Sequence, residues 1–227
     1  MVLAAKVFLL KEEADLPTIS GKLKGYKAED EFVHDDQKIP LLTEIAKLSM
    51  TQDSIEGVFS KDLVLSLSHR DGVKFVTKTM EAPFIFAVSR GRAFLIVLEK
   101  KNVANNIANI MSKILFISQG GIVEAKIPPE TLKKFHEANP EDTKVIFFDG
   151  VDIPNVNKLS LYGSVLADTA LYNDYSSRGS IWYMVFKSRK YGIVAGVTRS
   201  AVVTSFSEIK PAEFVTYIKE EVFPLIA

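Results

Sequence analysis

The sequence contains no cysteine. Disulfide bonds, thiolate nucleophiles and metal sites with cysteine ligands are therefore excluded. Net charge is missing too, because 28 basic residues balance 28 acidic residues in a chain of 227. A surface that binds phosphates usually carries an excess of positive charge, so this balance argues against a nucleic-acid partner.

Long hydrophobic runs and targeting signals are also missing. The apolar opening, Val2–Leu10, is too short to span a membrane and contains Lys6. It has no basic leader followed by a small-residue cleavage site. We therefore expect an N-terminal strand, no membrane partner and a cytoplasmic location. Glutamine is scarce, and together with the missing cysteine this composition favours a thermophilic source.

Catalytic and nucleotide-binding motifs are absent. Gly120-Gly121 is not followed by the glycine and lysine of a phosphate-binding loop. Gly163-Ser164 and Gly179-Ser180 lack the pattern of a nucleophile elbow. Asp149 and Asp152 lie around Gly150, as in an ordinary turn. We therefore expect no catalytic residue and no cofactor, and the sequence leans away from an enzyme without settling the question.

The three histidines, His34, His69 and His136, show no metal-ligand spacing to one another. The best metal candidate is His34-Asp35-Asp36, since imidazole and carboxylates can share a divalent ion. Adjacent residues in an acidic stretch more often form a solvated surface. We expect no metal.

What the chain does contain is an apparent internal repeat. Phe84–Val97 (FIFAVSRGRAFLIV) matches Ile193–Phe206 (IVAGVTRSAVVTSF), so that Arg90 falls on Arg199. Upstream, Val73–Met80 matches Ile181–Ser188, and an amphipathic helical segment follows each copy. A tandem duplication is the favoured interpretation, and chance similarity of amphipathic strands is the alternative.

Hydrophobic periodicity and turn residues predict the elements. Helices are expected at 40–50, where Pro40 precedes an apolar stripe, at 102–116, 128–138 and 165–175, and from Pro211 to the C-terminus. Residues 28–38 are expected to be a solvated loop, and Ser118–Gly121 a linker. Strands are expected at 3–10, 18–27, 54–58, 63–69, 73–80, 83–88, 93–98, 122–127, 144–148, 158–162, 180–187, 192–198 and 201–207.

Sets of short antiparallel strands followed by a helix predict an α+β protein. We expect two tandem repeats of an antiparallel sheet and a helix. Residues 1–118 comprise an N-terminal extension and the first repeat, and residues 119–227 the second, or the whole forms one continuous domain. The order of elements is similar to that of TATA-box-binding proteins and of roadblock or longin modules. This resemblance concerns element order alone, because no motif of either family is present.

The most distinctive polar cluster lies in and just after Leu171–Arg178. It contains residue types that are enriched at binding hot spots. The candidate binding residues are Tyr172, Tyr175, Arg178, Trp182 and Tyr183, with Arg90 and Arg199 of the two repeat turns. Partly buried packing residues and solvated turns are the alternative interpretations.

The favoured function is a non-enzymatic protein-interaction or scaffold protein, whose partner is another protein or a second copy as in a homodimer. The first alternative is a regulator that binds a nucleic acid or a small ligand on the two-repeat sheet. A hydrolase built on scattered carboxylates is the weakest alternative.

Overall fold

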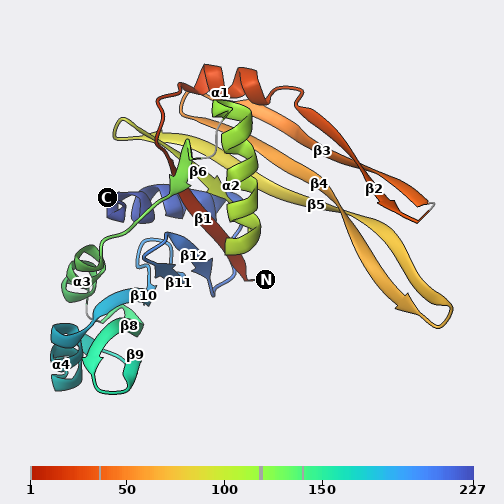
Figure 1. Cartoon of the computed structure of the whole chain (residues 1–227). Coiled ribbons are helices and arrows are strands. Elements are labelled where there is room, and N and C mark those ends of the chain that lie inside the picture. The colour runs from red at the N-terminus through yellow and green to blue at the C-terminus, as the bar shows by residue number, and fades with distance from the viewer. Residues whose placement is uncertain (1, 36, 118–119, 140) are drawn as a thin grey trace. The chain divides into compact units, whose positions relative to one another are not determined.

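A computed structural model describes residues 2–35, 37–117, 120–139 and 141–227. Over these residues the chain is an α+β protein with twelve strands and five α-helices (Figure 1). It divides into two compact units, which comprise Met1–Leu9 with Glu124–Ala227 (unit 1) and Leu10–Val123 (unit 2). No helix in the described part of the chain is long and apolar enough to cross a membrane.

Unit 2 is an antiparallel sheet of consecutive strands with two helices. The strands, which pair in chain order, are β2 (Lys27–His34), β3 (Gln37–Met50), β4 (Ser54–His69), β5 (Gly72–Ser89) and β6 (Arg92–Val97). The helices are α1 (Leu16–Leu23) and α2 (Lys101–Phe116), and the Lys22 ammonium donates to the Leu115 carbonyl between them. The core of unit 2 contains Phe84, Phe86, Leu95, Ile107 and Met111, all at most 1% exposed.

Unit 1 has a different strand order. Its sheet runs β1 (Leu3–Leu10), β12 (Val202–Ser205), β11 (Val194–Thr198), β10 (Ser180–Lys187), β8 (Thr143–Ile153) and β9 (Val156–Tyr162), again with antiparallel pairing. Its helices are α3 (Pro129–Ala138), α4 (Ala170–Arg178) and α5 (Pro211–Tyr217), the last continuing as a π-helical turn, Ile218–Val222. The short strand β7 (Ile122–Glu124) lies where the chain passes between the units, and the buried Lys6 on β1 forms an ion pair with Glu124.

Three predicted elements are wrong in the first fifty residues. The strand expected at 18–27 is helix α1, which begins because the Asp15 side chain accepts from the Thr18 N–H at 2.8 Å and Pro17 lies in its first turn. The loop expected at 28–38 forms strand β2 and the start of β3. The helix expected at 40–50 is part of β3, whose pairing with β2 and β4 overrides the helical spacing of its leucines.

Pro40 is compatible with β3 because of where it lies. It pairs with Glu31 of β2, whereas the pairing of β3 with β4 begins only at Thr43. Proline cannot donate a hydrogen bond to a ladder, so it is tolerated where one side of its strand has no partner.

The other predicted strands and helices differ from the structure mainly in where they begin and end. The pairs of strands predicted at 54–58 and 63–69, and at 73–80 and 83–88, are single long strands, β4 and β5. The helix predicted at 165–175 is a 3₁₀ turn, Leu166–Asp168, followed by α4, which ends at Arg178. Residues 118–119 of the predicted linker lie outside the described residues.

The two sequence matches behind the apparent repeat differ in outcome. Phe84–Val97 covers the end of β5 and β6, and Ile193–Phe206 covers the antiparallel pair β11 and β12, whereas the upstream match joins unlike elements. Val73–Met80 is the far half of β5, whereas Ile181–Ser188 is mainly a separate strand, β10. Arg90 and Gly91 form a two-residue turn with φ of 51° and 72°, whereas Arg199 begins a longer turn in which Ala201 has the positive φ, 51°. A tandem repeat is therefore not shown by these positions.

Candidate functional site

The structure separates the candidate residues of the Leu171–Tyr183 region. Tyr172 is 1% exposed, and its hydroxyl donates to Glu137 on α3 at 3.2 Å. Burial, with Glu137 contributing, raises the pKa of this phenol far above its ordinary value. Tyr175 is half-buried with its ring 6.3 Å from that of Phe148. Tyr172 and Tyr175 pack between α4 and the sheet, which argues against a role for Tyr172 in contacting a partner.

Arg178 and Arg90 lie apart from the other candidates. Arg178 is exposed at the end of α4, where its guanidinium donates to Asp174 at 2.8 Å. Arg90 belongs to unit 2, in the turn between β5 and β6. Neither residue shares a described contact with Trp182 or Tyr183.

Trp182 and Tyr183 belong to an aromatic cluster on the other face of the unit 1 sheet. Phe148 faces α4, so the adjacent Phe147 faces away from that helix. A bulge in β10 at Trp182 brings both Trp182 and Tyr183 against Phe147, at 5.6 and 5.4 Å between ring centroids. Tyr162 on the terminal strand β9 completes the cluster at 6.0 Å from Phe147 and is 68% exposed.

Two charged groups border this aromatic cluster (Phe147, Tyr162, Trp182 and Tyr183). The Lys158 ammonium lies 5.1 Å from the Trp182 ring centroid, within the range of a cation–π contact. The Arg199 guanidinium forms an ion pair with Asp149, and the Arg199 N–H donates to the Trp182 carbonyl at 2.8 Å. The structure thus brings the predicted residues Trp182, Tyr183 and Arg199 together. Sequence reasoning missed Phe147, Tyr162 and Lys158, which only the strand register identifies.

Gly196 makes room for the cluster. A Cβ at this position would lie 2.3 Å from the Tyr183 hydroxyl, so the Tyr183 ring lies directly over the β11 backbone. Burial raises the pKa of the Tyr183 phenol, and the neighbouring Tyr162 adds to the shift.

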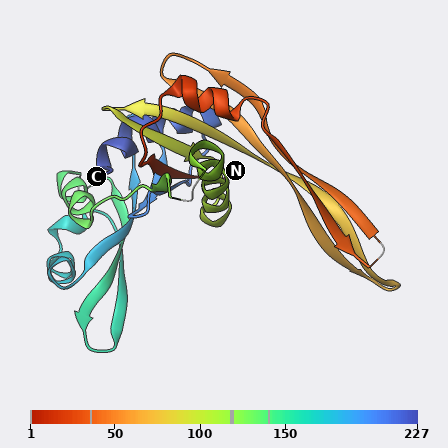
Figure 2. The ribbon, with the colours of Figure 1, turned by 45° about the horizontal axis from the view of Figure 1, so that its top comes forward.

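A second surface lies on the far half of the β4–β5 hairpin in unit 2. This half extends beyond α1 and α2 of the same unit (Figures 1 and 2). Strand alternation and register place one set of side chains on a single face, which we call the leucine face: Leu63, Leu65, Leu67, Lys74, Val76 and Lys78. The four apolar members are 37–50% exposed. Sequence reasoning predicted these strands but not that this face has no covering element in its own unit.

The opposite face of the same hairpin packs against the β2–β3 hairpin. The Phe75 ring lies 5.2 Å from Phe32 and 4.5 Å from His34. Where β3 leaves β4, Asp62 accepts from the Leu42 N–H at 3.0 Å and from the Thr79 hydroxyl at 2.6 Å. An open groove of about 700 Å³ lies here, with Glu29, Glu31 and Pro40 among its walls.

The histidine–aspartate motif does not form a described metal site. The His34 imidazole lies 3.6 Å from the Asp35 carboxylate and packs on Phe75, while Asp36 lies outside the described residues. No group of three histidine or acidic side chains with metal-binding geometry occurs among the residues that the structure describes.

Comparison with known proteins gives no family. No protein-family model matches the sequence, and no curated protein matches it. Function must therefore be argued from the surfaces above.

Proposed function

We propose that this chain is a non-enzymatic protein-interaction protein that associates with a second copy of itself through the leucine face. The observation that carries the proposal is the exposure of Leu63, Leu65, Leu67 and Val76 on one side of a projecting hairpin. A contiguous apolar surface of this kind on a soluble protein is typical of an interaction site.

The far half of β5 adds a second reason. It pairs with β4 throughout, whereas its pairing with β6 begins only at Phe84. Residues 72–82 therefore present a free strand edge within unit 2. Free edges pair readily with another chain unless charges or covering elements prevent it.

Charge complementarity supports a second copy as the occupant. Lys74 and Lys78 lie on the leucine face beside the apolar side chains. The face of β2 that points away from Phe75 carries Glu29, the 56% exposed Val33 and Glu31, whose carboxylate lies 3.4 Å from the Lys38 ammonium of β3. Lysines and leucines of one copy thus match Glu29 and Val33 of another, which is a head-to-tail interface.

The test is the oligomeric state of the full chain across a concentration series, measured by sedimentation velocity. Leu65→Ser with Leu67→Ser should shift the wild-type assembly to monomers, while Leu171→Ser, an exposed leucine on α4, should not. Circular dichroism melting curves establish that each variant is folded. A wild-type protein that stays monomeric at every concentration would overturn the proposal.

A charge exchange tests the head-to-tail arrangement. Lys74→Glu with Lys78→Glu should weaken association, as should Glu29→Lys with Glu31→Lys. An equimolar mixture of the two variants should associate more strongly than either alone, because both contacts between unlike variants then join lysines to glutamates. Equal association in all three samples would exclude this pairing.

The aromatic cluster supports a second candidate, the binding of single-stranded nucleic acid. Rings on an open sheet face stack with bases, and Lys158 and Arg199 lie beside them. Oligothymidylate should then quench the fluorescence of Trp182, the single tryptophan of the chain, with strong salt dependence that Lys158→Ala reduces. Unchanged fluorescence would exclude this candidate.

We also propose that the chain arose by tandem duplication, in which the match of Phe84–Val97 with Ile193–Phe206 is kept and the match of Val73–Met80 with Ile181–Ser188 is not. The order strand, helix, five strands, helix occurs twice, as β1, α1, β2–β6, α2 and as β7, α3, β8–β12, α5, with α4 as an insertion. The different neighbours of β8 and β9 are a departure from this order. An experimental structure in which β6–α2 and β12–α5 do not superpose would contradict the proposal.

A further inference from the structure

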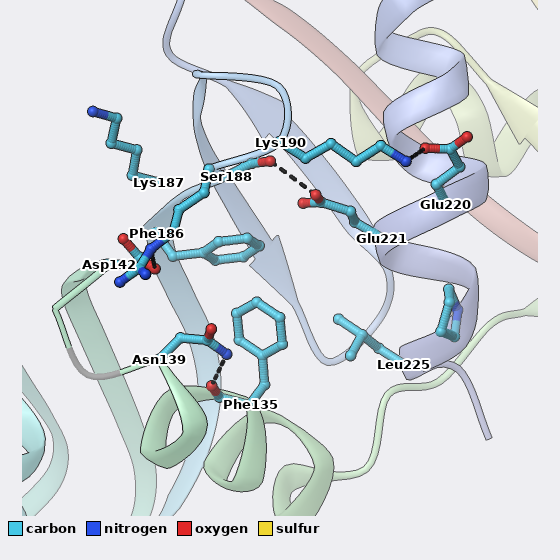
Figure 3. A pocket seen from close by; sticks show the side chains of 12 residues that line it. Phe135, Asn139, Asp142, Phe186, Lys187, Ser188, Lys190, Glu220, Glu221 and Leu225 are labelled. Carbon is cyan, nitrogen blue, oxygen red and sulfur yellow. Dashed lines mark hydrogen bonds and ion pairs between the residues drawn. The ribbon is translucent and has the colours of Figure 1, made fainter.

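Unit 1 contains a pocket that neither the aromatic cluster nor the leucine face uses. It has a volume of about 410 Å³ and lies among α3, the end of β10 and the π-helical turn after α5 (Figure 3). Phe135, Phe186, Pro224 and Leu225 give it an apolar wall, and the Phe135 and Phe186 rings are 4.7 Å apart. This volume suits a small organic molecule.

Most charges around the pocket are already paired. Arg189 donates to Asp142 at 2.6 Å, and Lys190 forms an ion pair with Glu220. Lys187 is exposed, and in Figure 3 its side chain points away from the two phenylalanine rings. These groups leave the pocket without a free cation directed at its apolar wall.

Glu221 is the acidic residue of the pocket wall that has no ion-pair partner among the described residues. Its Oε1 accepts from the Ser188 hydroxyl at 2.9 Å, and no described group donates to its Oε2. In Figure 3 the carboxylate lies on the side of the pocket that faces the Phe135 and Phe186 rings. Burial is the main cause that raises the pKa of this carboxyl, and it outweighs the opposing effects of Ser188 and Lys190. A carboxylate deprived of water next to aromatic rings is stabilised by a cation.

We propose that this pocket binds a small organic cation, in which an ammonium group is attached to an apolar body. The ammonium would donate to the free Glu221 oxygen, which is a charge-assisted hydrogen bond. The apolar body would lie against Phe135, Phe186 and Leu225, and the ring faces add cation–π attraction. A divalent metal is a poorer fit, because the other two carboxylates of the pocket, Asp142 and Glu220, are already paired with Arg189 and Lys190, and no metal-binding group of three occurs among the described residues.

The test is an NMR titration of the full chain with n-butylammonium, with 1-butanol as the uncharged analogue of equal length. Butylammonium should shift the amide signals of residues around the pocket, and 1-butanol should bind about tenfold or more weakly, since a hydrogen bond to a charged group is lost. Equal binding of the two compounds, or shifts scattered over the protein, would overturn the proposal.

A pair of variants on the same helical segment localises the effect. Glu221→Gln retains an acceptor for Ser188 but lacks the charge, so butylammonium binding should weaken roughly 10–100-fold. Glu213→Gln, on the exposed side of α5, should leave binding unchanged. Equal affinities of both variants would show that Glu221 is not the binding group. The measurement is independent of self-association, because the leucine face belongs to the other unit.

Discussion

The imidazole ring of His136 meets the ring of Tyr172 edge to face, with 4.7 Å between the centroids. The first side chain comes from α3 and the second from α4, and both are at most 1% exposed. His136 Nδ1 lies 2.8 Å from the Thr143 hydroxyl of β8, while its Nε2 is buried without a described partner. This pair joins the two helices to the sheet of unit 1.

The buried imidazole predicts a pH dependence of stability. Burial lowers the pKa of His136 below its ordinary 6.5, and the opposing effect of Glu137 is smaller. Below pH 6.5 the unfolded chain therefore binds a proton that the folded chain does not, so stability falls as the pH falls through this window. Urea unfolding at pH 7.5 and pH 5.5 measures the loss, which should be smaller in His136→Gln. Equal losses in the variant and the wild type would contradict this role.

Tyr172 should act as a core residue. Tyr172→Ala removes a buried ring and should lower the free energy of unfolding by about 3–5 kcal/mol. Tyr172→Phe removes only the hydrogen bond to Glu137 and should cost about 0.5–1.5 kcal/mol. Urea denaturation checks both values, and sedimentation should show no change of oligomeric state. A stable Tyr172→Ala variant with weakened association would instead assign Tyr172 to an interface.

The close approach of Tyr183 to Gly196 predicts an epistatic pair. Gly196→Ala should destabilise the protein by about 1–3 kcal/mol, because the new methyl group overlaps the Tyr183 ring. In a Tyr183→Ala background the same change should cost much less, and a double-mutant cycle measures this coupling. Additive effects would mean that the strain at Gly196 has another source.

Asp62 should hold the two hairpins of unit 2 together where they diverge. In Asp62→Ala the Leu42 N–H loses its acceptor, so its hydrogen exchange should accelerate. Asp71→Ala, at the exposed tip of the same hairpin, should leave the exchange of Leu42 unchanged. Unchanged exchange in Asp62→Ala would show that the hydrogen bond to Asp62 is not what protects this amide.

The sequence predicted secondary structure correctly where the residues of a segment strongly favour either a helix or a strand. The α+β class is confirmed, and the strands predicted at 3–10 and 180–187 and the helix predicted at 102–116 lie at or close to their predicted positions. Helix α1 was also accessible from sequence, because Asp15 and Pro17 are an N-cap and a first-turn proline. The helix predicted at 40–50 was wrong. Leu41, Leu42, Ile45 and Leu48 have helical spacing, but the pairing of this segment with neighbouring strands makes it part of β3.

The candidate site was harder to predict from the sequence than the secondary structure, because it depends on which sheet face each side chain occupies. Tyr172 and Trp182 are of the same residue class and close in sequence, yet one is in the core and the other on the opposite sheet face. The bulge at Trp182 and the register of β8 decide this, and neither leaves a local pattern. The leucine face and the Glu221 pocket likewise depend on which surfaces distant segments leave uncovered.

The composition of unit 1 from residues 1–9 and 124–227 has a consequence for biosynthesis. Leu3 pairs with Ser205, so β1 meets β12 only after residue 205 has been made, whereas β7, which also pairs with β1, is complete at residue 124. Unit 2 has all of its residues earlier and can fold first. The nascent chain therefore carries an apolar strand, LAAKVFLL, without β12 until residue 205 is made, and protection of the edge that pairs with β12 is a demand that this topology places on the cell.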